Sequence, residues 1–235
     1  SLADMDPEHA NSAALVMGKM RDENVPMDIA TYATMLLALA NAGKVEKAEH
    51  LLAQMESNVE TIGFAPNAVC YNTTLDGLAK SNDPNAPAQA EALLKHMDHQ
   101  YETGVIPEPP DIVSYSSVID AWCRSSDPSG AEFAEKLLLE CELKSQSNPR
   151  LSPDVVPYNI VLDAYSRRGA GRQKGALGRS RIDSSFAKRA ERLLSHMQEG
   201  HNPAALPGTI SYNCVLNAWA NSNADVKAAS RAREI

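Results

Sequence analysis

The sequence predicts an all-α fold, an α-solenoid of stacked antiparallel helix pairs, and two recurring patterns support this prediction. Each of five tyrosines follows a proline by five or six residues and precedes an apolar run with helical spacing: Tyr32, Tyr71, Tyr115, Tyr158 and Tyr212. A second block, Ala-Glu-x-Leu-Leu-x-x-Met or a close variant, follows the first four tyrosines at 48–55, 90–97, 134–141 and 190–197. A pair of short helices cannot bury its own apolar face, so repeated pairs must stack on one another.

The repeat at 68–111 shows how each element is predicted. Apolar residues recur on one helical stripe over 68–79, which indicates a first helix. A polar turn follows at 81–85, and a second amphipathic helix contains the block from Ala90 to Met97. Prolines near the end of the repeat stop this helix, because proline cannot continue one. Strand signals are weak throughout. We expect equivalent, mostly buried tyrosines between helices, with Trp122 and Trp219 also in the core.

Aligned in this way, residues 1–235 form a single array of repeats. The repeats cover 29–67, 68–111, 112–154 and 155–208, with partial repeats at 1–28 and 209–235. Successive tyrosines lie 39, 44, 43 and 54 residues apart, and part of this length follows the Met-type position, which predicts long second helices. Because the chain begins without methionine and stops within a second-helix block, we expect it to be a fragment of a longer protein.

Composition excludes several classes of function. The chain is 43% hydrophobic and 22% charged, which is typical of a foldable domain, and no apolar run approaches the length of a membrane span. The spacing of the four cysteines fits neither a disulfide framework nor a zinc motif. His96 and His99 have a spacing that could bind a metal, but no cysteine or carboxylate cluster joins them. We therefore expect no metal, no cofactor and no catalysis in this segment.

The repeat resembles the pentatricopeptide repeat. That family's first-helix consensus, Val-Val-Thr-Tyr-Asn-Thr-Leu-Ile-Asp-Gly, is similar to residues 68–77, 112–121, 155–164 and 209–218. Its Pro-Asp ending is matched by Pro66-Asn67, Pro110-Asp111 and Pro153-Asp154. The resemblance implies a right-handed superhelix that binds single-stranded RNA with sequence selectivity, in RNA processing in a mitochondrion or plastid (chloroplast). It further implies a monomer that lies outside membranes and that could bind protein partners in addition to RNA.

The resemblance also implies which residues contact RNA. The residue after each tyrosine and the last residue of each repeat form a pair that meets the Watson–Crick edge of one base. These pairs are Ala33 with Asn67, Asn72 with Asp111, Ser116 with Asp154, and Asn159 with Gly208, while Asn213 has no partner within the chain. Apolar residues two before the tyrosine would clamp the base: Val69, Val113, Val156 and Ile210. A second role stays open for the pairs' aspartates and Asp28, because they stand where helix N-caps occur.

A basic insertion, residues 168–186, interrupts the repeat at 155–208. Nine of the chain's 22 basic residues lie between Arg167 and Arg192, opposed by two acidic ones. Four glycines lead us to expect that residues 169–183 are mobile. Four cations are expected to contact RNA phosphates: Arg172, Lys174, Arg179 and Arg181. The alternative is a solvated surface insertion without function.

Net charge is the main observation against RNA binding. A total of −8 repels a polyanion at long range. The alternative function is a protein-interaction scaffold that binds an extended peptide. The polar pairs discriminate between the two hypotheses, because reading a base requires them and binding a peptide does not.

Overall fold

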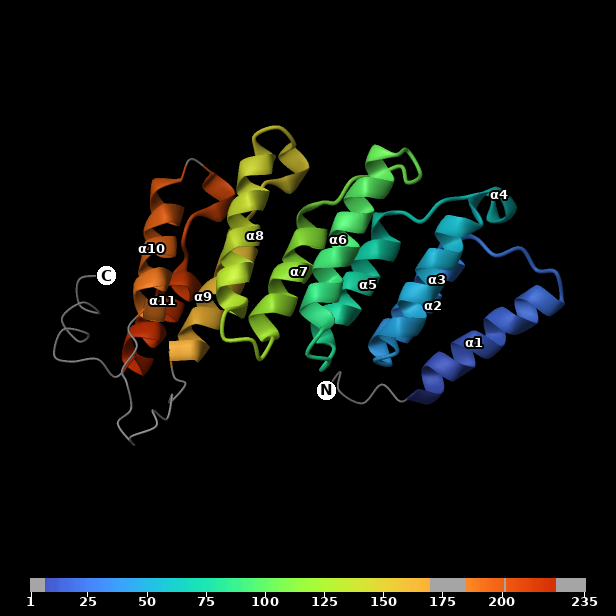
Figure 1. The fold of residues 1–235 in the computed structure, drawn as a ribbon, viewed down its shortest axis with the longest axis horizontal. Helices are drawn as coiled ribbons and strands as arrows, with labels where there is room; N and C mark the ends of the chain where they lie inside the picture. Colours follow the sequence, from blue (N-terminus) through green and yellow to red (C-terminus); the bar gives the residue numbers. More distant parts are fainter. Residues whose placement is uncertain (1–6, 170–184, 201, 223–235) are drawn as a thin grey trace. The chain divides into compact units, whose positions relative to one another are not determined.

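The computed structural model describes residues 7–169, 185–200 and 202–222, and in these ranges it contains helices and no strand. Figure 1 shows their order along the chain. The first helix of each predicted repeat begins at that repeat's first residue: α2 (Ile29–Asn41), α5 (Ala68–Lys80), α7 (Ile112–Arg124), α9 (Val155–Gly169) and α11 (Thr209–Asn221). The second helices are α1 (Pro7–Asp22), α3 (Val45–Ser57), α6 (Ala86–Glu102), α8 (Gly130–Ser145) and α10 (Ser185–Glu199). Short helices follow three of them: α4 (Val59–Ile62), η2 (Pro149–Leu151) and η3 (Pro203–Ala205).

The chain forms two compact units, a first unit (1–121) and a second unit (122–235). In the first unit, α2 packs against α1, α3 and α5, and α5 packs against α6. In the second unit, α9 packs against α8, α10 and α11. The predicted all-α fold of neighbouring helix pairs is therefore confirmed. A continuous array and its right-handed superhelix stay predictions.

Local sequence explains where the helices begin and end. The Asp28 carboxylate accepts a hydrogen bond from the Thr31 backbone N–H at 2.8 Å, so the expected N-cap of α2 is present. Gly63, with φ of 87°, follows α4 in the left-handed conformation that commonly ends a helix. The prediction of long second helices holds for α6 and α8, which have 17 and 16 residues. It does not hold for α3, with 13 residues, or for α10, with 15, since the first helices α2, α5, α7 and α11 have 13 residues and α9 has 15.

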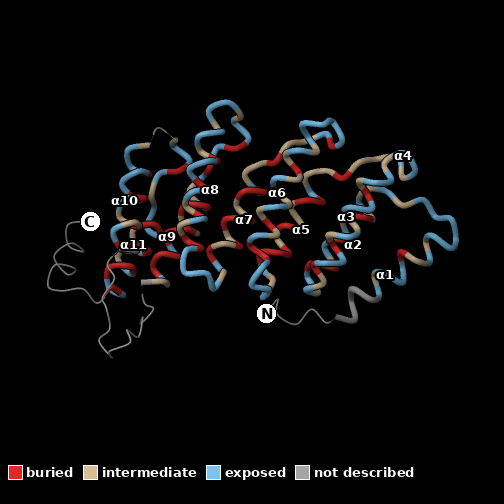
Figure 2. The backbone as a smooth tube through the Cα atoms, viewed as in Figure 1, coloured by how far each residue is buried: buried red, intermediate tan, exposed pale blue. Residues whose placement is uncertain are grey.

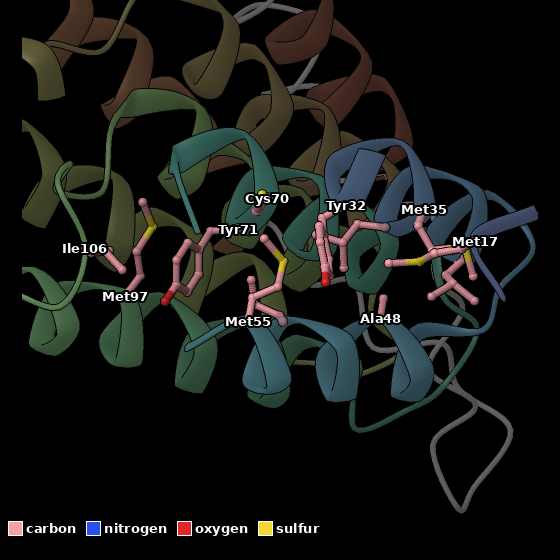
Figure 3. Packing of buried hydrophobic residues seen from close by; sticks show 12 residues of the cluster. Met17, Tyr32, Met35, Ala48, Met55, Cys70, Tyr71, Met97 and Ile106 are labelled. Atoms are coloured by element: carbon pink, nitrogen blue, oxygen red, sulfur yellow. The ribbon is translucent and has the colours of Figure 1, made fainter. Parts of the chain in front are cut away.

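The core consists of residues at recurring positions of the repeat. In the first unit, Figure 3 shows Tyr71 between Met55 and Met97, and all three side chains are fully buried. The alanine that opens each second-helix block is also fully buried, which lets the paired helices approach closely: Ala48, Ala90, Ala134 and Ala190. Figure 2 shows buried residues recurring along successive helices in this way. Repetition in the sequence thus corresponds to repetition in the core.

One expectation about aromatic residues needs correction. Four of the five tyrosines are buried and Tyr212 is half-buried, which agrees with the expected burial. Trp219 lies in the core as expected. Trp122 is half-buried, because it packs at the surface against Phe133, with ring centroids 4.7 Å apart and Phe133 itself exposed. Not every aromatic position of the repeat is therefore a core position.

The residue after the Met-type position links one repeat to the next. Glu56, which follows Met55, accepts a hydrogen bond from the Tyr71 hydroxyl and contacts His96 Nε2 at 2.9 Å. In the second unit, Gln198 Nε2 donates to the Tyr212 hydroxyl at 2.9 Å. His96 is therefore a structural partner of a carboxylate. Among the described residues, no group of three or more His, Cys, Asp or Glu side chains could hold a metal ion, and no helix is long and apolar enough to cross a membrane.

Candidate nucleic-acid interface

Asn72 and Asp111, predicted as a pair from two successive repeats, lie in direct contact in the first unit. Asn72 Nδ2 donates to Asp111 Oδ1 at 3.2 Å, and Ser114 Oγ donates to Asn72 Oδ1 at 2.6 Å. The Asp111 carboxylate also accepts from the Ser114 backbone N–H at 3.0 Å, at the start of α7. Asp111 therefore caps α7 and holds Asn72, while its contact with a base stays a prediction.

A similar arrangement occurs in the second unit around Asn159. Ser211 Oγ donates to Asn159 Oδ1 at 2.7 Å and accepts from the Gly208 backbone N–H at 3.2 Å. Gly208 has no side chain, so the Asn159 amide has no carboxylate opposite it. The two sites therefore share a serine hydroxyl and differ in the second member of the pair.

The other predicted pairs differ from these two. Ala33 is half-buried and has no polar side chain, while Asn67 caps α5 by accepting from the Cys70 backbone N–H at 3.2 Å. Ser116 and Asp154 belong to different units, so their pairing stays a prediction. Asp154 is exposed, and its carboxylate accepts from the Val156 backbone N–H at 2.9 Å.

The predicted clamp residues are apolar side chains on the surface. Their exposed fractions are 55% for Val69, 52% for Val113, 52% for Val156 and 64% for Ile210. Each lies three residues before a polar residue of the predicted set, which places the two on the same face of a helix: Asn72, Ser116, Asn159 and Asn213. Every first helix from α5 onward therefore presents an exposed apolar group beside an amide or hydroxyl.

Basic residues extend this face, and the sequence analysis did not identify them. Asn72, Asp76 and Lys80 follow one another at intervals of four residues on α5, so they share one stripe. Lys80 Nζ contacts Asp76 at 2.5 Å, and the equivalent Arg167 Nε contacts Asp163 at 2.9 Å on α9. The signal was available in the sequence, because a basic residue stands nine positions after three of the tyrosines: Lys80, Arg124 and Arg167.

Two of the nine basic residues between Arg167 and Arg192 have a structural role. Arg168 Nη2 donates to the carbonyls of Ser125 and Asp127 at 3.0 Å each, beyond the end of α7. Arg189, on α10, contacts Glu132 at 3.2 Å and Glu135 at 3.3 Å. Residues 170–184 lie outside the described residues. They include the expected mobile segment, apart from Gly169, and the four cations expected to contact phosphates: Arg172, Lys174, Arg179 and Arg181.

Two family models match parts of the chain. Residues 27–80 match the family model described as the PPR repeat family, and residues 113–140 match the one described as the PPR repeat. A similar solved structure is the pentatricopeptide repeat protein PPR10 in complex with an 18-nt psaJ RNA element, at 26% identity and a TM-score of 0.46. The match covers 88% of this chain and 28% of that one. A cysteine-to-serine variant of PPR10 with the same RNA element gives the same values. No curated protein sequence matches the chain.

Proposed function

We propose that this chain, which belongs to the pentatricopeptide repeat family, binds single-stranded RNA with base selectivity along its first helices. The observation that carries the proposal is the contact between Asn72 Nδ2 and Asp111 Oδ1 at 3.2 Å. Two residues 39 positions apart supply one polar group, and exposed Val69 lies one helical turn away on the same face. An apolar surface beside a hydrogen-bonding pair is what an unpaired base requires, since it has a flat face and a polar edge.

The hydrogen-bonding capacity of the pair supports base reading. One Nδ2 proton of Asn72 is directed to Asp111, which leaves the other proton for a base. Asp111 Oδ2 is a further acceptor, so the pair combines a donor and an acceptor. All four bases have neighbouring donors and acceptors on the Watson–Crick edge, so spacing and size determine selectivity. The family's pairing habit favours a pyrimidine at this position.

Basic residues on the same helices offer a way for a chain of negative net charge to bind the RNA polyanion. Lys80, Arg124 and Arg167 recur at one position of three repeats, where they would meet phosphates. Lys80 and Arg167 contact Asp76 and Asp163, so each would exchange an aspartate for a phosphate on binding RNA. Three such contacts give a slope of about −2 for log K against log salt on single strands. The chain can therefore carry a charge of −8 and still attract RNA locally.

The setting of this activity is also part of the proposal. By family resemblance, the protein works in RNA processing in a mitochondrion or chloroplast, as a monomer that can recruit protein partners. The chain covers 28% of the length of PPR10. Any activity of a complete protein, including catalysis, is a separate question from RNA binding by these repeats.

Binding of the 235-residue chain to single-stranded RNA and to duplex RNA of the same sequence tests the proposal. We expect tighter binding to the single strand, because base edges are accessible only there. The double substitution Asn72→Ala with Asp111→Ala should reduce discrimination at one nucleotide. A matched control, Asn82→Ala with Asp22→Ala, removes one amide and one carboxylate from exposed positions and should leave discrimination unchanged.

The rival function gives the opposite pattern. If no RNA binds at low salt while an extended peptide does, the chain is a peptide-binding scaffold. If RNA binds and both double variants discriminate like the parent, RNA binding stands and the assignment of Asn72 and Asp111 is wrong.

A further inference from the structure

We infer that Ser114 and Ser211 are positioning residues that fix which end of a reading amide faces the RNA. The inference rests on the proposed function, because it concerns Asn72 and Asn159 as base-reading residues. An asparagine side chain can present either its N–H donors or its carbonyl acceptor, and a rotation of 180° exchanges them. Something must select one orientation if the amide is to distinguish bases.

At Asn72 the contacts define the orientation chemically. A carboxylate only accepts hydrogen bonds, so the amide nitrogen must lie on the side of Asp111. On the other side, Ser114 Oγ accepts from the Asp111 backbone N–H at 3.2 Å. Its one hydroxyl proton has two acceptors within reach, Asn72 Oδ1 at 2.6 Å and Asp111 Oδ1 at 3.1 Å, and the shorter distance favours Asn72. Both contacts favour the same orientation, with the N–H group available for a base.

At Asn159 the serine acts alone. The Gly208 backbone N–H donates to Ser211 Oγ at 3.2 Å, and Ser211 Oγ donates to Asn159 Oδ1 at 2.7 Å. Glycine supplies no carboxylate, so the backbone-to-serine relay is the contact that determines the amide's direction. Both Nδ2 protons are then left for the base, and this site presents only donors.

The sequence of the chain itself supports this assignment. Serine precedes the tyrosine in the two repeats that follow a reading asparagine, namely Ser114 after Asn72 and Ser211 after Asn159. Repeats that follow Ala33 and Ser116 have Cys70 and Pro157 at this position instead. Ser114 and Ser211 are fully buried, so their hydroxyls act through the asparagines rather than on the RNA.

An RNA-free measurement tests the contact. In a proton–nitrogen NMR spectrum of the chain, the side-chain amide signal of Asn72 is identified by its loss in Asn72→Ala. We expect Ser114→Ala to shift this signal and Ser114→Thr, which keeps a hydroxyl, to restore it. The control Ser117→Ala removes a hydroxyl that contacts only the Val113 carbonyl of its own helix, at 3.1 Å, and should leave the signal in place.

Selection from a pool of single-stranded RNA with randomised sequence tests the consequence for reading. Ser211→Ala should lower the base preference at one nucleotide about fivefold, the equivalent of one neutral hydrogen bond. Total affinity for the pool should change less, and Ser211→Thr should recover the preference. Ser114→Ala should have a smaller effect, because Asp111 still orients Asn72.

The outcomes separate the two proposals. If the parent chain selects no base at any position, base reading is wrong and the role of the serines falls with it. If the parent is selective and folded Ser211→Ala and Ser114→Ala proteins select the same bases equally well, base reading stands and the positioning role is overturned. An unshifted Asn72 amide signal in Ser114→Ala contradicts the positioning role independently of RNA.

Discussion

Removing one hydroxyl group from Tyr71 should destabilise the first unit measurably. The Tyr71 side chain is fully buried, and its hydroxyl donates to Glu56. Burial and this carboxylate raise the pKa of the Tyr71 phenol, so it stays a donor throughout the working range of pH. A hydrogen bond to a charged group contributes about 1.5–3 kcal/mol. Because Glu56 keeps its contact with His96 at 2.9 Å, we expect Tyr71→Phe to cost about 2 kcal/mol.

Urea denaturation followed by circular dichroism measures this cost. In thermal denaturation of a chain of this size, a loss of about 2 kcal/mol corresponds to a decrease of about 4–8 °C in Tm. The control is Tyr101→Phe, in which the same atom is removed from a side chain that is 43% exposed, and where the change should stay within about 0.5 kcal/mol. In a Glu56→Gln background the cost of Tyr71→Phe should fall to about 1 kcal/mol, because the acceptor is then neutral. Equal losses for Tyr71→Phe and Tyr101→Phe would refute the reasoning.

Three further predictions concern thiols, a half-buried carboxyl and the insertion. Burial raises the pKa of Cys141 to about 12, and all four cysteines are buried, so a thiol reagent should modify the native chain at least about 100-fold more slowly than the unfolded chain. Burial, then repulsion from Glu46, raises the pKa of the Glu49 carboxyl. The folded state therefore binds this proton more tightly, and ionisation of Glu49 costs stability as pH rises above the ordinary range of glutamate. Glu49→Gln should accordingly increase the free energy of unfolding by about 0.5 kcal/mol at pH 7, and the gain should vanish below pH ~4. Glutamine at the four insertion cations should weaken binding of all RNA sequences alike and reduce the salt slope by about 0.7 per lost contact: Arg172, Lys174, Arg179 and Arg181.

Most of the fold could be predicted from the sequence because the repeat supplied independent copies of each signal. Proline fixed where each repeat ends, and the first helices begin at the predicted residues, such as Ala68 for α5 and Thr209 for α11. Features that do not recur from repeat to repeat were harder to predict from the sequence. The short helix after α3 is α-helical, whereas those after α8 and α10 are 3-10 helices, and the partial exposure of Tyr212 depends on its particular neighbours.

The candidate site was partly predictable for the same reason. The family resemblance, carried over by register along the repeat, implied the pair Asn72 and Asp111, and their hydrogen bond joins residues that are distant in sequence. Ser114 and Ser211 were missed, because a serine in the first turn of a helix also fits an ordinary capping role. Their contact with the asparagine of the preceding repeat requires the stacking of two repeats, which the sequence of one repeat does not contain.

The central claim, that the asparagine side chains of first helices α5 and α9 face bound RNA, can be tested most directly by NMR. A single-stranded, uridine-rich oligonucleotide is titrated into the chain while the side-chain amide signals of Asn72, Asn159 and Asn82 are followed. The proposed function predicts saturable shifts at Asn72 and Asn159 with one shared affinity, and no shift at Asn82 in the exposed turn between α5 and α6. Saturable binding that leaves the signals of Asn72 and Asn159 unchanged would contradict the claim.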